Sequence, residues 1–349
     1  MKKLTIAVIF GGCSPEYGVS LQSASAVIQA INQNLYQLVL IGISEQGNWY
    51  HFRGEIKQIA DNTWCNQKDC LPAALIPSRG SAEIVVFHSH GNEKIHIDAA
   101  FPILHGKNGE DGTIQGYIEL AGIPLIGCGT LASALCMDKI RAHKLVEAAG
   151  ITVPAGCVID QTNTTASIKN QADVLGYPLF VKPVHAGSSF GITKVSKPLD
   201  LDEAIKLAFQ YDQQVILEVA MDGFEVGCAI IGNQELTIGE VDEIELSKGF
   251  FDFTEKYTLK SSSIHVPARI SKQETEEVKH TAERIYQVLG CRGFARVDLF
   301  VCSDRKVVFN EVNTIPGFTS HSRFPNMMKA RGFSFEQVIE KIIKEAIGE

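Results

Sequence analysis

Two runs near the carboxyl end of the chain combine charged side chains with the composition of β-strands. Phe294–Val301 and Val307–Val312 are rich in β-branched and aromatic residues, and the polar segment 302–306 between them is typical of a turn. The sequence therefore predicts a β-hairpin. Its acidic, amide and guanidinium groups could bind a metal ion or stabilise negative charge.

The predicted hairpin brings oxygen ligands together. Side chains alternate along a strand, so Asp298 should share a face with Phe300. Glu311 and Asn313 should likewise share a face with Phe309. If these faces coincide, three oxygen ligands converge without His or Cys, which suits a hard cation such as Mg²⁺ bridging phosphates. A charged, solvated hairpin face is the alternative explanation.

The segment 313–323 follows the hairpin directly and is rich in hydroxyl groups around a Pro-Gly turn. The backbone N–H of Gly317 and the hydroxyls of Ser320 and Ser322 could bind a carboxylate or an oxyanion. The sequence thus favours a substrate site beside the predicted metal site.

Length and composition limit the class of protein. A chain of 349 residues is long enough for two or three domains. A net charge of -8 gives no support for nucleic acid or an anionic membrane as a partner. The nine cysteines are scattered and form no CxxC pair, which predicts reduced thiols in the cytoplasm. No apolar run approaches the roughly 20 residues that span a bilayer.

The N-terminal region has a β-α-β pattern. The apolar run Leu4–Phe10 resembles the start of a signal peptide, but Gly11 and Gly12 end it early, so we expect a buried strand. Val19–Asn32 should be an amphipathic helix and Tyr36–Ile43 the next strand. The glycine pair lacks the G-x-G-x-x-G spacing of a dinucleotide site.

A further strand in this region, Asp98–Leu104, ends at His105 in a glycine-rich loop. Loops at the carboxyl ends of parallel strands form ligand sites in α/β sheets. An isolated His in such a loop is more often structural, and Glu16 at a helix N-terminus is explained by the helix dipole alone.

The middle of the chain contains a loop suited to phosphate. The strand Tyr177–Pro183 precedes the small-residue segment 185–191, and Ile192–Val195 is the next strand. Backbone N–H groups in such a loop can close over phosphates, and Lys182 adds a point charge. No GKS or GKT is present, so this is not a Walker A loop. A plain hairpin connection is the alternative.

Three further segments frame these elements. The strand Val215–Met221 should leave the central region at a junction suited to a ligand cleft. The long aromatic loop Leu246–Ile264 is either a lid or an ordered surface loop. Capping boxes predict helices from Ser271 to Leu289 and from Ser334 to Ile347, and Glu235–Glu243 should be a strand.

Several motifs together carry a family resemblance. GGCSPEYGVS, HGKNGEDGTIQG, MDK, HAGSSFG and RVDLF…NEVNTIPGFTSHSR resemble segments of the D-alanine–D-alanine ligase family, from Phe10 to Pro325. In detail the chain is similar to the VanG-type D-alanine–D-serine ligases of vancomycin resistance. The resemblance implies an α/β and α+β protein with the ATP-grasp fold and an N-terminal Rossmann-like domain. The implied domains are 1–128, 129–214 and 215–349, the last with a lid loop at 246–264.

The resemblance also implies a role for each matching residue. The implied catalytic residues are Glu16, Ser188, Lys256, Tyr257, Arg296, Gly317 and Ser322, and the resemblance also implies a hydrogen bond between Ser188 and Glu16. The implied substrate-binding residues are Val19, His105, Asp242, Phe251 and Arg323, with Glu110 supporting His105. The implied ATP-binding residues are Lys139, Phe180, Lys182, Ser188, Ser189, Glu218, Val219, Met221, Glu225, Asn310 and Glu311. The implied metal ligands are Asp298, Glu311 and Asn313, for two Mg²⁺ or Mn²⁺ ions.

The reaction implied is ATP-dependent joining of D-alanine to a second D-amino acid by a homodimeric enzyme. Lys256 and Tyr257 match the family and favour an amine acceptor over D-lactate. Phe251 and Arg323 depart from the pattern of D-alanine enzymes, which favours D-serine. D-alanine remains the alternative acceptor. A nucleotide-binding ATP-grasp protein without catalysis is the alternative of another class.

Overall fold

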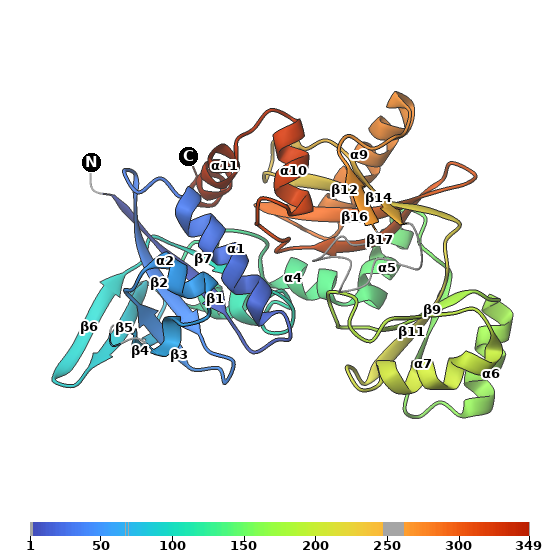
Figure 1. The fold of residues 1–349 in the computed structure, drawn as a ribbon, viewed down its shortest axis with the longest axis horizontal. Helices are drawn as coiled ribbons and strands as arrows, with labels where there is room; N and C mark the ends of the chain where they lie inside the picture. The colour runs from blue at the N-terminus through green and yellow to red at the C-terminus, as the bar shows by residue number, and fades with distance from the viewer. Residues whose placement is uncertain (1–2, 67, 69, 247–261, 349) are drawn as a thin grey trace.

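The computed structural model describes residues 3–66, 68, 70–246 and 262–348 and contains three β-sheets (Figure 1). The sheets follow one another along the chain, in the N-terminal, central and C-terminal regions. The N-terminal region lies at one end of the view, while the central and C-terminal regions face each other at the other end.

The N-terminal sheet has seven strands in the order β6-β5-β4-β3-β2-β1-β7. They are β1 (Leu4–Gly11), β2 (Tyr36–Ile43), β3 (Trp49–Phe52), β4 (Cys70–Leu75), β5 (Glu83–His88), β6 (Gly91–His96) and β7 (Ala99–Ile103). β1 runs parallel to both β2 and β7, and the remaining pairs are antiparallel. The predicted β-α-β start is confirmed, since α1 (Tyr17–Ala30) connects β1 to β2.

Helices cover both faces of this sheet. α1 packs on β1 on one side, and Ile114 and Ile118 of α3 (Thr113–Leu120) lie in a separate core on the other. Two short elements, α2 (Ile56–Ala60) and the 3-10 helix η1 (Trp64–Asn66), follow β3. Because both faces are buried, β1 is apolar along almost its whole length.

The central sheet is small and antiparallel, in the order β10-β9-β11-β8. Its strands are β8 (Gly156–Asp160), β9 (Leu179–Pro183), β10 (Thr193–Val195) and β11 (Gln214–Val219). The helical elements α6 (Thr165–Leu175), η2 (Pro198–Asp200) and α7 (Leu201–Ala208) lie beside it. Its hydrophobic core draws its buried members from residues 159–217 alone.

The C-terminal sheet has six strands, with β15-β14-β12-β16-β17 in order and β13 paired to β12. They are β12 (Gly223–Ile231), β13 (Thr237–Ile238), β14 (Asp242–Leu246), β15 (Ser262–His265), β16 (Phe294–Cys302) and β17 (Val307–Asn313). The predicted hairpin is confirmed as β16 and β17. The single strand predicted over 235–243 is wrong, because β13 ends at Ile238 and β14 begins only at Asp242.

Among the described residues, five helices cover the C-terminal sheet. They are α4 (Thr130–Met137), α5 (Lys139–Ala148), α9 (Lys272–Val288), α10 (Arg323–Ala330) and α11 (Phe335–Ile347). The capping boxes predicted at Ser271 and Ser334 are present, with Glu274 and Gln337 as their partners. α4 and α5, which the sequence assigns to the central domain, pack in the core of the C-terminal sheet instead. The predicted domain boundaries themselves stay a prediction.

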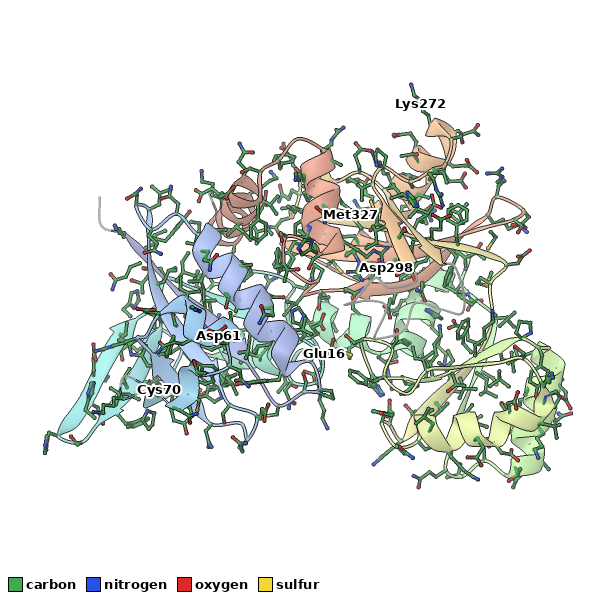
Figure 2. The ribbon with its side chains drawn as sticks, in the orientation of Figure 1. Glu16, Asp61, Cys70, Lys272, Asp298 and Met327 are labelled. Carbon is green, nitrogen blue, oxygen red and sulfur yellow. The ribbon has the colours of Figure 1, made fainter. Side chains whose placement is uncertain are left out.

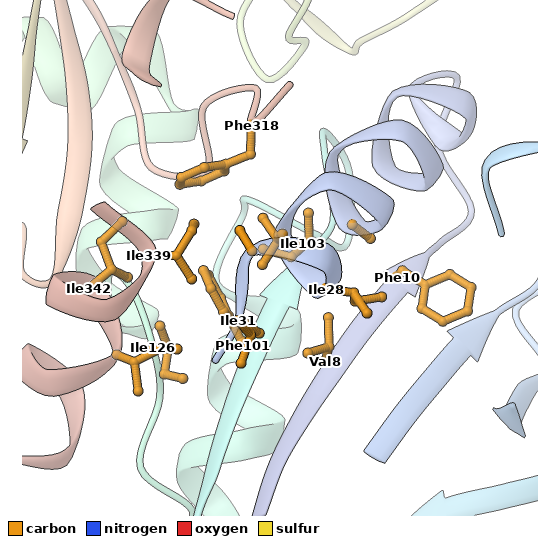
Figure 3. Packing of buried hydrophobic residues seen from close by; sticks show 14 of the residues in the cluster. Val8, Phe10, Ile28, Ile31, Phe101, Ile103, Ile126, Phe318, Ile339 and Ile342 are labelled. Carbon is orange, nitrogen blue, oxygen red and sulfur yellow. The ribbon is translucent and has the colours of Figure 1, made fainter. Parts of the chain in front are cut away.

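One hydrophobic core joins the two ends of the chain. Val8, Phe101 and Ile28 of the N-terminal region pack in the same cluster as Phe318 and Ile342 (Figure 3). The rings of Phe318 and Phe101 meet edge-to-face with their centroids 6.3 Å apart. The N-terminal and C-terminal sheets are therefore held together by a common core, whereas the central sheet has its own.

Two global expectations concern the membrane and the cysteines. No helix in the described part of the chain is long and apolar enough to cross a lipid bilayer. All nine cysteines lie in described positions and are free thiols, which confirms the prediction that they form no disulfide framework.

Candidate active site

A β-bulge in the β16–β17 hairpin shapes the predicted metal site. Asp298 lies opposite Glu311, but Leu299 lies opposite Phe309, so Asn310 is an extra residue on β17. The bulge reverses the alternation, and Phe309 is fully buried in the core beside Leu299. The prediction that Phe309 shares a face with Glu311 and Asn313 is therefore wrong. The prediction that Asp298 and Glu311 share a face is confirmed.

Asp298 sits in a dense polar cluster on the C-terminal sheet (Figure 2). Arg296 donates Nε–H to Oδ1 at 2.8 Å and Nη2–H to Oδ2 at 2.6 Å, and Asn313 Nδ2 donates to Oδ2 at 2.9 Å. Burial opposes the charge of Arg296, but Asp298 beside it raises the pKa of Arg296 above its ordinary value. The cluster keeps a guanidinium cation next to the predicted metal ligands.

The chemistry of this ligand set fits a divalent cation only in part. Within the described residues, no three His, Cys, Asp or Glu side chains gather in a way that could hold a metal. The predicted set has two carboxylates and one amide, so Asn313 has to supply the third oxygen. Both Asp298 oxygens already accept hydrogen bonds from Arg296. A cation would therefore have to replace or share one of these bonds.

The first of two cavities lies between the central and C-terminal sheets and has a volume of about 380 Å³. Ten of the eleven predicted ATP-binding residues line it, namely Lys139, Phe180, Lys182, Ser189, Glu218, Val219, Met221, Glu225, Asn310 and Glu311. Lys139 and Lys182 reach it from α5 and β9, and both are buried. The cavity thus combines two cations with an apolar wall.

One atom of this cavity lacks a partner among the described residues. Glu218 is 2% exposed, and its Oε1 accepts a hydrogen bond from Lys182 Nζ. Its Oε2 is buried without any hydrogen bond, with His143 Nδ1 3.9 Å away. Burying a carboxylate oxygen unpaired is unfavourable. A ligand with an N–H or O–H donor at this point would satisfy it.

The glycine-rich loop separates the first cavity from the second. Ser189 lines the first cavity and Ser188 the second. Both serines have positive φ, at 60° and 47°, a strained backbone conformation that is concentrated at functional sites. Ser188 Oγ donates to Glu16 Oε1, so the expected bond between the loop and the N-terminal region is present.

Glu16 is held at the point where the N-terminal region approaches the central one (Figure 2). A Cβ on Gly106 would lie only 2.3 Å from Glu16 Oε2, so the His105–Gly106 turn admits only glycine at this point. Gly106 has a φ of 70°, which glycine adopts without strain. The glycine of the HG motif therefore makes room for the carboxylate.

The second cavity has a volume of about 100 Å³ and gathers residues from all three regions. Nine predicted site residues line it, namely Glu16, Val19, His105, Ser188, Arg296, Asn313, Gly317, Ser322 and Arg323. They come from α1 and its N-cap, the loop after β7, the glycine-rich loop, β16, β17, and α10 with the segment before it. A small substrate bound here would contact each region of the protein.

Two buried titratable groups in the second cavity have shifted pKa values. Burial lowers the pKa of His105 to about 4, so its imidazole is neutral, with Nε2 3.1 Å from Ser23 Oγ. Burial, together with the charge of Glu16, raises the pKa of Glu110 to about 8. Glu110 accepts hydrogen bonds from Gly106 N at 2.9 Å and from Ile315 N at 3.1 Å, so it joins the two loops around the cavity.

Arg323 connects the two cavities. Its Nε and Nη2 donate to the carboxylate of Asp242 at 2.7 and 2.8 Å, and Nη1 donates to Glu225 at 2.7 Å. Gly227 provides the space for this pair, because a Cβ there would lie 2.4 Å from Arg323 Nη2. Burial opposes the charge, yet Asp242 and Asp298 raise the pKa of Arg323. Arg323 is a fixed cation in the wall of the second cavity.

Not every predicted residue lies at a cavity. Of the predicted residues that the structure describes, Asp242 and Asp298 line neither cavity and act through the arginines beside them. Phe251, Lys256 and Tyr257 lie outside the described residues. Their predicted roles stay predictions.

Some residues of the first cavity escaped the sequence reasoning. Glu243, Glu245 and Arg269 line it, and Arg269 donates to Glu243 at 2.6 Å and pairs with Glu245 at 3.2 Å. Glu243 and Glu245 alternate along β14, a spacing that places both on one face and that the sequence does contain. Arg269 follows β15 by four residues and carries no comparable signal.

Comparison with known proteins gives matches along almost the whole chain. Models of the D-ala D-ala ligase N-terminus and C-terminus match residues 5–128 and 145–344. The vancomycin B-type resistance protein VanB of Enterococcus faecalis is 44% identical over 352 residues, covering 99% of each chain. A D-alanine–D-alanine ligase of Caldicellulosiruptor bescii is 42% identical, covering 99% of this chain and 96% of the relative.

A solved structure agrees in fold as well as sequence. The VanG D-Ala:D-Ser ligase from Enterococcus faecalis superposes with a TM-score of 0.92 at 54% identity, covering 99% of this chain and all of that one. The two cavities, the family matches and this superposition lead to one conclusion. The chain belongs to the D-alanine–D-alanine ligase family, whose members are ATP-dependent ligases with the ATP-grasp fold.

Proposed function

We propose that this protein is a D-alanine–D-serine ligase that makes a dipeptide precursor of peptidoglycan and thereby gives resistance to vancomycin. The observation that carries the proposal is the second cavity, where Glu16, Ser188, Arg296 and Gly317 surround one small space with Arg323 in its wall. The similar VanG enzyme is named a D-Ala:D-Ser ligase, and VanB is named a vancomycin resistance protein.

We assign the first cavity to ATP. Membership of the family implies ATP and a divalent metal ion. Lys139 and Lys182 supply positive charge for phosphates, and the unpaired Oε2 of Glu218 would accept a hydrogen bond from the nucleotide. A volume of about 380 Å³ lies within the range of small-molecule sites.

We assign the metal site to the β16–β17 hairpin. Asp298, Glu311 and Asn313 would hold two Mg²⁺ or Mn²⁺ ions. Lys139 lies beside them, with its Nζ 3.9 Å from Glu311 Oε2. When bound, the metal neutralises charge on the phosphates. To bind the metal ion, Asp298 has to give up or share one of its hydrogen bonds from Arg296. Glu311 lines the first cavity, on the side where the phosphates are proposed to lie.

The proposed reaction has two steps. The carboxylate of D-alanine attacks the γ-phosphorus of ATP, which releases ADP and forms D-alanyl phosphate. The amine of D-serine then attacks the acyl carbon, loses a proton, and inorganic phosphate leaves with the electrons of the C–O bond. Negative charge develops on the acyl oxygen during this step. Arg296 and the N–H of Gly317 both line the second cavity and are suited to stabilise it.

Other residues of the second cavity would orient the substrates. The carboxylate of Glu16 suits the ammonium group of D-alanine, and neutral His105 lies beside it. The Ser188–Glu16 bond closes the cavity on the side of the glycine-rich loop. Closure matters because water would hydrolyse an acyl phosphate. Lys256 and Tyr257 are proposed to complete this closure.

Arg323 is the proposed determinant of the acceptor. A polar wall favours D-serine over D-alanine because it can bind the extra hydroxyl of D-serine. D-alanine would leave the polar groups of the wall unpaired, which disfavours its binding. Asp242 and Glu225 fix the guanidinium of Arg323, so it presents a defined surface to the second cavity. Asp242 and Phe251 are proposed to act on the same subsite, Asp242 through Arg323.

A competition assay tests the function. The enzyme is incubated with ATP, Mg²⁺ and equal amounts of D-alanine, D-serine and D-lactate, and the products are identified by mass spectrometry. We expect D-alanyl-D-serine as the main product. D-alanyl-D-alanine alone would establish the alternative acceptor, and absence of any ATP-dependent product would favour a nucleotide-binding protein without catalysis. The proposed homodimer in the cytoplasm is tested separately, by light scattering and cell fractionation.

A further inference from the structure

His185 lies between two carboxylates at the start of the glycine-rich loop. Its Nδ1 is 2.8 Å from Asp212 Oδ2, and its Nε2 is 3.1 Å from Asp138 Oδ2. Asp138 is the N-cap of α5, and Asp212 follows α7 and precedes β11. His185 therefore bridges two elements that come from different parts of the fold.

The geometry at His185 requires a particular protonation state. A carboxylate only accepts hydrogen bonds, and a neutral imidazole has a single N–H to donate. Both bonds form together only when the ring is an imidazolium. The hydrogen bond to Asp212 and the charges of both carboxylates raise the pKa of His185, although burial opposes this.

The charged groups around His185 come from each neighbouring element. Arg141, in the first turn of α5, donates to Asp138 through its backbone N at 2.9 Å and through its guanidinium. It therefore shares Asp138 with His185. On the other side, Asp212 also accepts the backbone N–H of His185 at 2.7 Å. Lys139 Nζ donates to the carbonyl of Ala186, the next residue, at 2.7 Å.

These contacts fix the start of the glycine-rich loop, and residues further along the same loop reach the two cavities. Ser188 and Ser189, three and four residues further on, have strained positive φ values and line the second and first cavities. A strained loop keeps its conformation only where surrounding contacts determine it. The clamp formed by Asp138, His185 and Asp212 is such a contact, and it lies outside both cavities.

We propose that His185 is a positioning residue for ATP. As an imidazolium, His185 fastens the base of the glycine-rich loop to Asp138 and Asp212. The inference rests on the assignment of the first cavity to the nucleotide. His185 gains two carboxylate partners on folding, and both hydrogen bonds need the protonated ring. The clamp is therefore complete at low pH, where His185 is an imidazolium. It weakens as the pH rises through the raised pKa of His185.

The test compares KM for ATP in the wild-type protein, His185→Gln and His185→Arg between about pH 6 and about pH 9. At about pH 6, His185→Gln should raise KM roughly fivefold, the scale of a partly exposed ion pair, with a smaller change in kcat. The ratio of KM in His185→Gln to KM in the wild type should fall towards one at about pH 9. The titration of ATP affects both KM values equally and so cancels in this ratio. His185→Arg, which keeps its charge and can reach both carboxylates, should still have at about pH 9 the low KM that the wild type has at about pH 6.

A matched control and a second measurement make the outcome decisive. His96 also faces a carboxylate, with Nε2 3.4 Å from Asp98, but on β6 in the N-terminal region, so His96→Gln should leave KM for ATP unchanged. Calorimetric binding of a non-hydrolysable ATP analogue should show the same ratios even if the acceptor is not D-serine. Equal ATP affinity in His185→Gln and wild type at about pH 6, or an Arg variant with the pH slope of the wild type, would overturn the proposal.

Discussion

Arg323 combines a structural role in a buried ion cluster with its proposed role in acceptor specificity. Its guanidinium contacts Asp242, Glu225 and, at 3.4 Å, Asp298. Removing one partner of such a buried cluster leaves carboxylates uncompensated, at a cost of roughly 3–5 kcal/mol. Any test of Arg323 therefore has to separate loss of fold from loss of selectivity.

We predict that Arg323→Lys lowers the ratio of D-serine to D-alanine incorporation while the protein stays folded. Lysine keeps the positive charge but loses the planar fork that contacts Asp242 at two points. Arg323→Leu should lower the ratio further and also reduce stability. The ratio is measured by mass spectrometry at equal acceptor concentrations, beside thermal melting of each variant. An unchanged ratio in both variants would remove Arg323 from the acceptor subsite.

His105 gives a prediction about stability and pH. Its pKa is lowered to about 4 in the folded protein, against an ordinary value of 6.5. At His105 the unfolded chain therefore binds a proton more readily than the folded protein. The contribution of neutral His105 to the unfolding free energy is fully present above about pH 6.5 and is lost as the pH falls towards 4. Between pH 7 and pH 5, the wild type should lose roughly 2 kcal/mol of unfolding free energy more than His105→Gln. Urea unfolding at the two pH values measures this, and parallel losses would contradict it.

At the residue scale, the sequence motifs indicated one pairing within the site and missed another. The serine of HAGSSFG and the glutamate of GGCSPEYGVS are 172 residues apart, and their predicted bond is present. The bond rested on a family pattern of polar residues. By contrast, nothing in the spacing of Asp242 and Arg323 indicates a bidentate ion pair, because it depends on how β14 and α10 pack across β12.

At the scale of elements, strand periodicity predicted the hairpin and failed at one residue. Alternation placed Phe309 with Glu311, and the bulge at Asn310 moved it to the opposite face. The run is rich in strand-forming residues whether or not a bulge is present, so composition alone does not reveal the bulge. Two long-range contacts hold the bulge: His143 Nε2 donates to the carbonyl of Asn310 at 2.9 Å, and the N–H of Phe309 donates to the carbonyl of Thr152 at 2.9 Å.

We therefore predict that His143→Leu weakens both the fold and ATP binding. The change leaves the partly buried carbonyl of Asn310 without this donor, at a cost of about 1 kcal/mol. Because Asn310 and Glu311 line the first cavity, a displaced bulge should also raise KM for ATP. His143→Gln retains a donor and should be affected less. Urea unfolding and steady-state kinetics give the two readings, and a leucine variant equal to wild type in both would exclude this role.

At the scale of the molecule, the cores divide the chain differently from its sequence segments. The core shared by the N-terminal and C-terminal regions includes Ile6 and Ile342, close to the two ends of the chain. Amphipathic patterns indicate which residues are buried but not which core receives them. That is why α4 and α5 were assigned to the central domain, although they pack with the C-terminal sheet.

This division predicts that the protein has two units that open separately. Phe318→Ala removes a ring from the shared core and should cost about 3–5 kcal/mol. Leu217→Ala creates a cavity in the central core instead, at about 2–5 kcal/mol. Hydrogen exchange should therefore accelerate in both β1 and β16 with Phe318→Ala, while β9 and β11 keep wild-type protection. Leu217→Ala should give the reverse pattern, because the two cores have no buried member in common. Uniform acceleration in either variant would mean that all three sheets unfold together, and the central sheet could then not move independently to admit ATP.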